Sequence, residues 1–115
     1  MAKCVVLWTS DRRATVVSIT DGVEEILHVE SKAKRRVEGR RRHPLSGHYR
    51  KVIHAITDAR SIFIFGPAQA KMELKGEILK VERLSHRVVG TETADTMTEN
   101  QLVARAREMY GWQAV

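Results

Sequence analysis

Cysteine and long hydrophobic runs are scarce in this sequence of 115 residues. Its single cysteine, Cys4, can neither form an internal disulfide nor build a structural zinc site alone. The longest early apolar run, Cys4 to Trp8, is shorter than a membrane-spanning helix of roughly 18 residues and shorter than the apolar part of an export signal. These absences predict a cytoplasmic protein with no membrane contact.

Aromatic residues are also few, at 5% of the sequence. Both tryptophans, Trp8 and Trp112, are expected to pack within the protein. Tyr49 is the one aromatic residue near the strongly basic segment described next. Base stacking and sequence-specific readout of nucleic acid are therefore not indicated for that segment.

The charge of the chain is concentrated in one place. Twenty lysines and arginines outnumber 14 aspartates and glutamates, for a net charge of +6. Residues 32–43 contain one acid, Glu38, and seven basic residues: Lys32, Lys34, Arg35, Arg36, Arg40, Arg41 and Arg42. The remaining 13 basic and 13 acidic residues balance each other. A neutral body with one basic segment favours a local contact with a polyanion, although a solvated loop without any partner would have the same composition.

The first thirty residues predict three antiparallel strands, at residues 3–9, 14–20 and 23–29. The first two are rich in β-branched residues. Asp21-Gly22 provides the positive-φ pair that a tight hairpin needs between the second and third strands. A basic loop, residues 32–45, then interrupts the apolar pattern.

Helices and strands alternate in the rest of the chain. Apolar residues recur at three- and four-residue spacing after Ser46, a plausible N-cap. The continuous apolar run Ile62–Phe65 predicts a central strand buried on both faces, and Thr98–Gln101 is a helix capping box. The expected elements are a helix at 46–59, a strand at 61–65, a helix at 67–83, a strand at 88–93 and a helix at 98–111.

This order of elements predicts one domain over residues 1–115, because domains span roughly 100 to 200 residues. Right-handed crossovers would join two parallel strands to the antiparallel hairpins. The expected fold is therefore α/β and ribonuclease H-like, with a mixed five-stranded sheet in the order 3-2-1-4-5 and three helices.

Several segments resemble one family of translation proteins. Residues 62–74, IFIFGPAQAKMEL, are similar to a strand, turn and helix in the middle domain of eukaryotic and archaeal peptide-chain release factors. Residues 5–16 resemble the opening hairpin of that domain, and the basic loop lies where the domain has its own basic loop. Small bacterial release-factor-like proteins, called translational machinery proteins, share the Gly-Pro-Ala-x-Ala-Lys-x-Glu-Leu pattern and resemble residues 92–95 and 98–107 as well.

The loop departs from the release-factor pattern at the catalytic motif. The resemblance implies a Gly-Gly-Gln tripeptide, which helps water to attack the peptidyl-tRNA ester. Here the loop contains neither Gly-Gly nor Gln, and the glutamines are Gln69, Gln101 and Gln113. Peptide release by that route is not expected, and the sequence predicts a protein that is not an enzyme.

The loop is the first candidate binding site. Guanidinium groups bind phosphates through paired hydrogen bonds and release counterions when they bind RNA. The predicted RNA-binding residues are Lys32, Lys34, Arg35, Arg36, Arg40, Arg41, Arg42 and His43. The expected partner is ribosomal RNA, transfer RNA or the ribosome; an acidic protein bound by a homo-oligomeric interaction domain, such as a homodimer, is the alternative.

A second candidate is an anion site at Gly66, Ala68 and Lys71, where a helix begins directly after a buried strand. Free backbone N–H groups at such a position favour an anion, although a turn selected only for packing would look the same. A metal-dependent RNA hydrolase is the least favoured reading, because acids such as Asp11, Asp58 and Asp95 do not follow the order that two-metal nucleases use. No metal site and no cofactor are expected.

Overall fold

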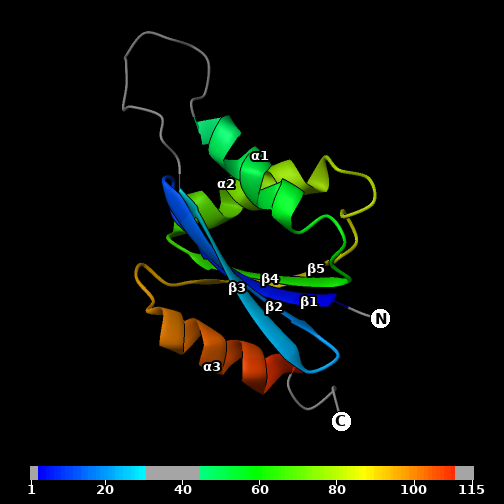
Figure 1. The fold of residues 1–115 in the computed structure, drawn as a ribbon. Coiled ribbons are helices and arrows are strands. Elements are labelled where there is room, and N and C mark those ends of the chain that lie inside the picture. The colour runs from blue at the N-terminus through cyan, green and yellow to red at the C-terminus, as the bar shows by residue number, and fades with distance from the viewer. Residues whose placement is uncertain (1–2, 31–44, 111–115) are drawn as a thin grey trace, which may run out of the picture.

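The computed structural model describes residues 3–30 and 45–110, and in these residues it has a five-stranded sheet covered by three helices (Figure 1). The elements are β1 (Lys3–Thr9), β2 (Arg13–Thr20), β3 (Val23–Glu30), α1 (Leu45–Ala55), β4 (Ser61–Gly66), α2 (Ala68–Leu79), β5 (Val88–Thr93) and α3 (Glu99–Tyr110). The strand order is β3-β2-β1-β4-β5. The predicted α/β architecture and its 3-2-1-4-5 sheet are confirmed.

Strand direction follows the chain's connections. Tight turns join β1 to β2 and β2 to β3, so these pairs are antiparallel. Asp21 and Gly22 form the second turn with φ values of 53° and 80°, the left-handed conformation that the sequence predicted. The helical crossovers through α1 and α2 make β4 parallel to β1 and β5 parallel to β4.

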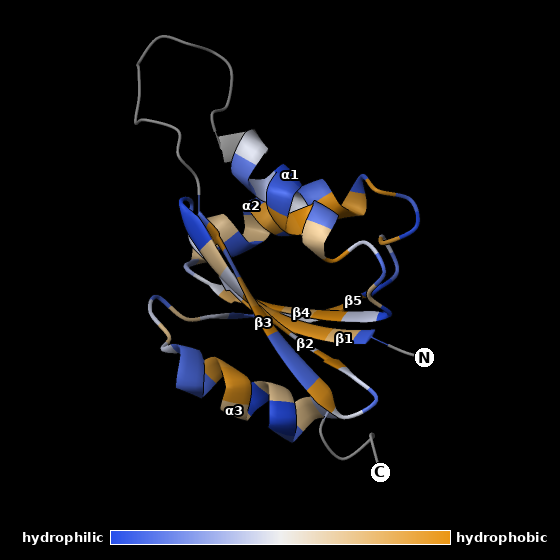
Figure 2. Cartoon of the chain, viewed as in Figure 1, coloured by the Kyte–Doolittle hydropathy of each residue, from blue (hydrophilic) through white to orange (hydrophobic). Residues whose placement is uncertain are grey.

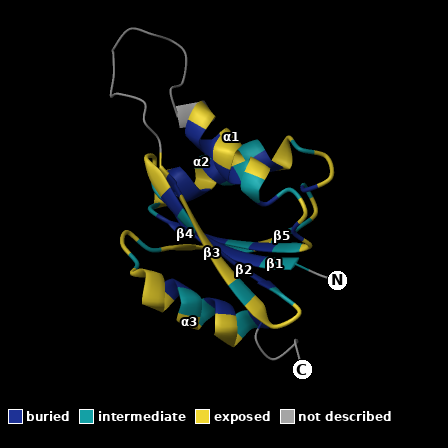
Figure 3. Ribbon diagram, viewed as in Figure 1, coloured by how far each residue is buried: buried dark blue, intermediate teal, exposed yellow. Residues whose placement is uncertain are grey.

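The sheet separates two apolar clusters, one under α1 and α2 and the other under α3 (Figures 2 and 3). Side chains alternate between the two faces along each strand. Val5 and Leu7 of β1 therefore pack against α1 and α2, whereas Val6 and Trp8 pack against α3. Burial of both faces holds β1 at the centre of the sheet.

Strand β4 lies between β1 and β5, in the inner position that the predicted strand order gives it. Its burial is less complete than predicted, because Phe63 is only partly buried while Ile62, Ile64 and Phe65 are buried. Gly66 ends the strand in very close contact with β1. A Cβ atom at Gly66 would lie 2.3 Å from the carbonyl oxygen of Thr9, so this position requires glycine.

Two helices end earlier than the sequence predicted. The chain continues past Ala55 and past Leu79 in turns, whose N–H groups bond to carbonyls three residues back, as Ala59 does to Ile56. Leu84 is buried in such a turn, so apolar spacing continued beyond the helix itself. Helix α1 begins at Leu45, which we expected to be the last residue of the basic loop.

The start of α3 agrees with its predicted capping box. The Thr98 N–H donates to Gln101 Oε1 at 2.9 Å, and the Gln101 N–H donates to Thr98 Oγ1 at 3.1 Å. Among the described residues, no helix is both long enough and apolar enough to cross a membrane.

Candidate functional site

Four strands end at one edge of the sheet, which we call the carboxyl edge. Strands β1, β3, β4 and β5 run in the same direction, and their last residues are Thr9, Glu30, Gly66 and Thr93. Ligand sites of α/β sheets commonly lie at this edge. The structure therefore places the ends of four strands and the β1–β2 turn in one region.

The predicted RNA-binding residues, from Lys32 to His43, lie outside the described residues, so their role stays a prediction. The described chain on either side of them reaches the carboxyl edge. On one side, β3 ends at Glu30. On the other, His48 in the first turn of α1 packs against Thr9, with 3.4 Å between its Nε2 and the Thr9 hydroxyl oxygen.

On the α1/α2 face, His48 is a buried imidazole, only 2% exposed. The Thr9 hydroxyl donates to the Ser10 carbonyl at 2.9 Å, which leaves its oxygen free to accept from His48 Nε2–H. His48 Nδ1 has no hydrogen-bond partner within the described residues. Burial lowers the pKa of His48, Lys51 lowers it further, and the Ser10 backbone and Asp11 oppose the shift. The structure thus favours a neutral imidazole.

Next to His48, Tyr49 and Glu73 join α1 to α2. The Tyr49 hydroxyl donates to Glu73 Oε1 at 2.8 Å, and Gln69 Nε2 donates to Glu73 Oε2 at 3.1 Å. Burial, together with the Glu73 carboxylate, raises the pKa of the Tyr49 phenol. Tyr49 and Glu73 thus tie α1 to α2, and Gln69 binds Glu73 from the exposed side of α2.

The predicted anion site lies beside this network. A cavity of about 240 Å³ at the start of α2 is lined by Ser10, Asp11, Pro67, Gln69, Ala70 and Glu73. Its two carboxylates, Asp11 and Glu73, oppose an anion. Of the predicted residues, Gly66 packs against the Thr9 carbonyl, Ala68 is exposed, and Lys71 is buried with the apolar face of α2. The anion site stays a prediction that this geometry does little to support.

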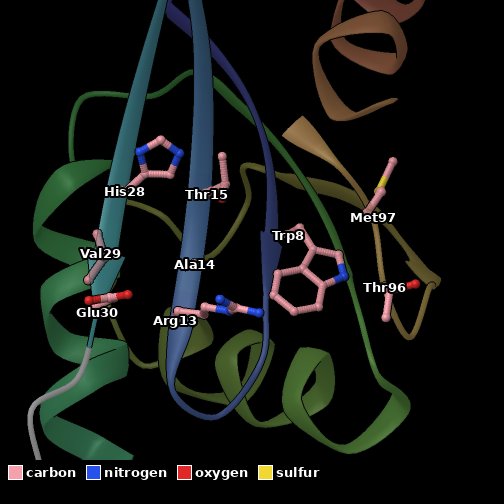
Figure 4. Close-up of a pocket in the computed structure, with 9 residues that line it drawn as sticks. All are labelled: Trp8, Arg13, Ala14, Thr15, His28, Val29, Glu30, Thr96 and Met97. Carbon is pink, nitrogen blue, oxygen red and sulfur yellow. The ribbon is translucent and has the colours of Figure 1, made fainter. Parts of the chain in front are cut away.

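On the α3 face, the carboxyl edge has a larger cavity of about 330 Å³, which we call the Trp8 cavity (Figure 4). It is lined by Trp8, Arg13, Ala14, Thr15, His28, Val29, Glu30, Thr96 and Met97. The Trp8 indole N–H donates to the Ala94 carbonyl at 2.9 Å, which fixes the segment after β5 beside the sheet. His28 Nε2 lies 2.9 Å from Glu99 Oε1 at the start of α3.

We did not predict this cavity from the sequence, where Trp8 was expected only to pack within the protein. The strand register brings its residues together: Trp8 pairs with Thr15, which pairs with His28, and Arg13 pairs with Glu30. Polar residues at alternating positions of β2 and β3 were the available signal, since their side chains point to the same face as Trp8.

The acids considered for a nuclease are scattered. Asp58 binds Lys3 at 3.0 Å, and Glu92, a further acid near the end of β5, lies 3.5 Å from Arg105. Within residues 3–30 and 45–110, no group of three or more His, Cys, Asp or Glu side chains could hold a metal ion. Burial raises the pKa of the Cys4 thiol, which disfavours the reactive thiolate.

Comparisons with known proteins identify the fold. No protein-family model matches the sequence, and no curated protein matches it either. The structure is similar to Archaeoglobus fulgidus Pelota, with 11% identity and a TM-score of 0.63 over 97% of this chain and 32% of that chain. Thermoplasma acidophilum Pelota is 14% identical, with a TM-score of 0.64 over 96% of this chain and 33% of that chain. An archaeal translation termination factor is 15% identical, with a TM-score of 0.60 over 97% of this chain and 36% of that chain.

The chain spans about a third of the length of each of these proteins. At such low identity the likeness concerns the fold alone. It agrees with the resemblance to release factors that the sequence indicated. This chain has the fold of one part of archaeal Pelota and of an archaeal translation termination factor.

Proposed function

We propose that this protein is a non-catalytic module of translation that binds ribosomal or transfer RNA through its basic loop. The observation that carries the proposal is the position of the loop in the chain: it holds the whole net charge and joins the last residue of β3 to the first turn of α1. The fold shared with Pelota and a translation termination factor supports a role in translation. We also propose that residues 1–115 act as one cytoplasmic domain.

The charge distribution favours phosphate binding by the loop over a diffuse contact. Because the rest of the chain is neutral, the loop dominates the field that an approaching polyanion meets. Seven basic residues in twelve provide several phosphate contacts without any base recognition of their own.

The absence of Gly-Gly-Gln from the loop supports the non-catalytic part of the proposal. The purified protein should not release peptide from a ribosomal complex, and added Mg²⁺ should not make it cleave RNA. Reproducible RNA cleavage that disappears with Asp11→Asn or Asp95→Asn would favour the hydrolase instead.

The test compares two triple variants that lose the same charge. Replacing Arg40, Arg41 and Arg42 by Ala should weaken RNA binding and flatten the dependence of log affinity on log salt by about 2 to 3. Replacing Lys75, Lys80 and Arg83 by Ala, on and just after α2, should leave both nearly unchanged. Equal RNA affinity of the two variants, both folded, would remove the loop from RNA binding.

A homo-oligomeric interaction domain remains the second candidate, because the outer edge of β3 exposes apolar side chains. Val23, Ile26 and Leu27 are 59%, 40% and 48% exposed. Edge strands with exposed apolar residues tend to pair with another chain. Sedimentation of a dimer that dissociates with Ile26→Lys, together with RNA binding insensitive to the loop substitutions, would favour this candidate.

A further inference from the structure

We propose that the Trp8 cavity binds one unpaired nucleotide, with its base against Trp8 and Met97 and its phosphate at Arg13. The inference rests on the proposed function in one respect, namely that the natural partner is RNA. The basic loop by itself indicates only phosphate contacts. The Trp8 cavity would add a separate site for one base. The cavity's volume of about 330 Å³ lies within the range of small-ligand sites, about 300 to 1,000 Å³.

The rigid part of the site comes from the sheet. Trp8, Thr15 and His28 form one row across β1, β2 and β3, and Arg13 and Glu30 lie opposite each other two residues nearer the carboxyl edge. The indole of Trp8 is mostly buried and is held by its hydrogen bond to Ala94. A preformed aromatic wall loses little conformational freedom when a base packs on it.

Arg13 provides a cation for a phosphate. Its guanidinium has no ion-pair partner within the described residues, whereas Arg105 and Arg107 of α3 are paired with Glu92, Glu108 and Glu24. In Figure 4 the Arg13 side chain extends toward the Trp8 side of the cavity and away from Glu30. Such an arginine can form paired hydrogen bonds with phosphate oxygens.

The mixture of groups favours a nucleotide over an acidic peptide. An acidic peptide would use Arg13 but would leave the aromatic wall of the cavity unused. A nucleotide would use both: its phosphate binds Arg13 and its base packs on the Trp8 ring, while Thr15, Thr96 and Glu30 offer hydrogen-bonding groups for the base edge or the ribose.

The place of the cavity links it to the basic loop. Glu30 lines the cavity and is the last residue of β3, and Lys32 follows two residues later in the sequence. Two residues span at most about 7 Å, so a phosphate bound at Lys32 would bring an RNA strand close to the Trp8 cavity. One unpaired base of that strand could enter it.

The experiment uses Trp8 as the reporter. The chain has two tryptophans, so Trp112→Phe leaves Trp8 as the only one. AMP should quench the fluorescence of this variant in a saturable way, with a dissociation constant on the order of 1 mM, as expected for one stacked base with one phosphate. Ribose 5-phosphate, which lacks the base, should not. Excitation at the red edge of tryptophan absorption avoids absorption by AMP.

Two single substitutions provide the matched pair. In the Trp112→Phe background, Arg13→Ala should weaken AMP binding at least five-fold, about 1 kcal/mol. Arg12→Ala removes the same charge from the adjacent exposed residue, which does not line the cavity, and should have no effect. Absence of saturable quenching, equal quenching by ribose 5-phosphate, or equal effects of the two substitutions would overturn the proposal. Stronger binding of a polyglutamate peptide than of AMP would overturn it as well.

The loop variant separates this inference from the proposed function. Replacing Arg40, Arg41 and Arg42 by Ala should leave the AMP affinity of the Trp8 cavity unchanged while it lowers the affinity for RNA. If the loop variant keeps its full RNA affinity while Arg13→Ala still weakens AMP binding, the loop proposal fails and the cavity stands. If the loop variant loses RNA and AMP never quenches Trp8, the cavity fails and the loop stands.

Discussion

Polar side chains at the carboxyl edge have different surroundings on the two faces of the sheet. On the α1/α2 face, the Tyr49 hydroxyl donates to Glu73 at 2.8 Å and His48 is buried against Thr9. On the α3 face, Arg13 and other polar residues line an open cavity of about 330 Å³. Tyr49 and His48 thus join elements on the first face, whereas Arg13 on the second face is accessible.

The difference comes from how far the helices cover the strands. Tyr49, the fifth residue of α1, packs in the apolar cluster. On the other face, Thr96 and Met97 precede α3 and line the Trp8 cavity, so this segment lies beside the last rows of the sheet without filling the space over them. Buried polar groups must find partners inside the protein, whereas uncovered ones are available to a ligand.

The largest loss of stability is expected at Gly66, because the packing on both faces of the sheet depends on its close contact with Thr9 of β1. Gly66→Ala would place a Cβ atom 2.3 Å from the Thr9 carbonyl oxygen, so β1 and β4 would have to separate. The free energy of unfolding should fall by about 3 kcal/mol or more, measured by urea denaturation. Gly76→Ala is the matched control, because nothing lies within 4 Å of its added Cβ. This control should raise the free energy of unfolding by about 0.5 to 1 kcal/mol. Equal stability of the two variants would contradict the close approach.

The next effect compares one buried tyrosine on each face. Tyr49→Phe removes the donor to Oε1 of the partly buried Glu73 carboxylate and should lower the free energy of unfolding by about 1.5 to 3 kcal/mol. Tyr110→Phe breaks a neutral pair with Ser61 at 2.6 Å and should cost only about 1 kcal/mol. Neither change should alter AMP binding. A greater loss of stability for Tyr110→Phe would contradict the difference between the faces.

Most of the fold was predictable because its determinants are local in the sequence. Asp21-Gly22 specified a tight hairpin, and Thr98 with Gln101 specified the start of α3. The crossover rule then fixed the strand order. The ends of α1 and α2 were not predictable from apolar spacing, because Ala59 and Leu84 are buried in turns that keep nearly the same spacing.

The site was harder to predict because its residues meet through the sheet. Thr15 and His28 are thirteen positions apart in the sequence and face each other only through the hairpin register. The two-residue turn at Asp21-Gly22 fixes that register, so this pair could have been identified from the sequence. The place of Trp8 beside Thr15 depends also on the β1–β2 turn, whose length the sequence pattern did not specify.

A smaller effect is expected from pH, through His48. Its pKa is lowered in the folded protein by burial, so between that value and the usual 6.5 the unfolded chain binds more protons. Stability should therefore be full above pH 6.5 and fall as the pH decreases through this window. Urea denaturation between about pH 5 and pH 8 measures it, and His48→Gln should remove this part of the dependence. The same slope in both proteins would contradict a buried neutral His48.

The smallest effect is expected from Gln69→Ala, which removes the second hydrogen bond to Glu73. This bond, at 3.1 Å, joins residues four apart on the exposed side of α2, and such pairs contribute about 0.2 to 0.5 kcal/mol. Tyr49 remains bonded to the other carboxylate oxygen. Urea midpoints of Gln69→Ala, Tyr49→Phe and the double variant give the coupling between the two bonds. We expect the tyrosine to account for nearly all the stabilisation, because its bond is shielded from water and that of Gln69 is not. A loss above about 1 kcal/mol for Gln69→Ala alone would mean that the exposed part of the network also holds α1 against α2.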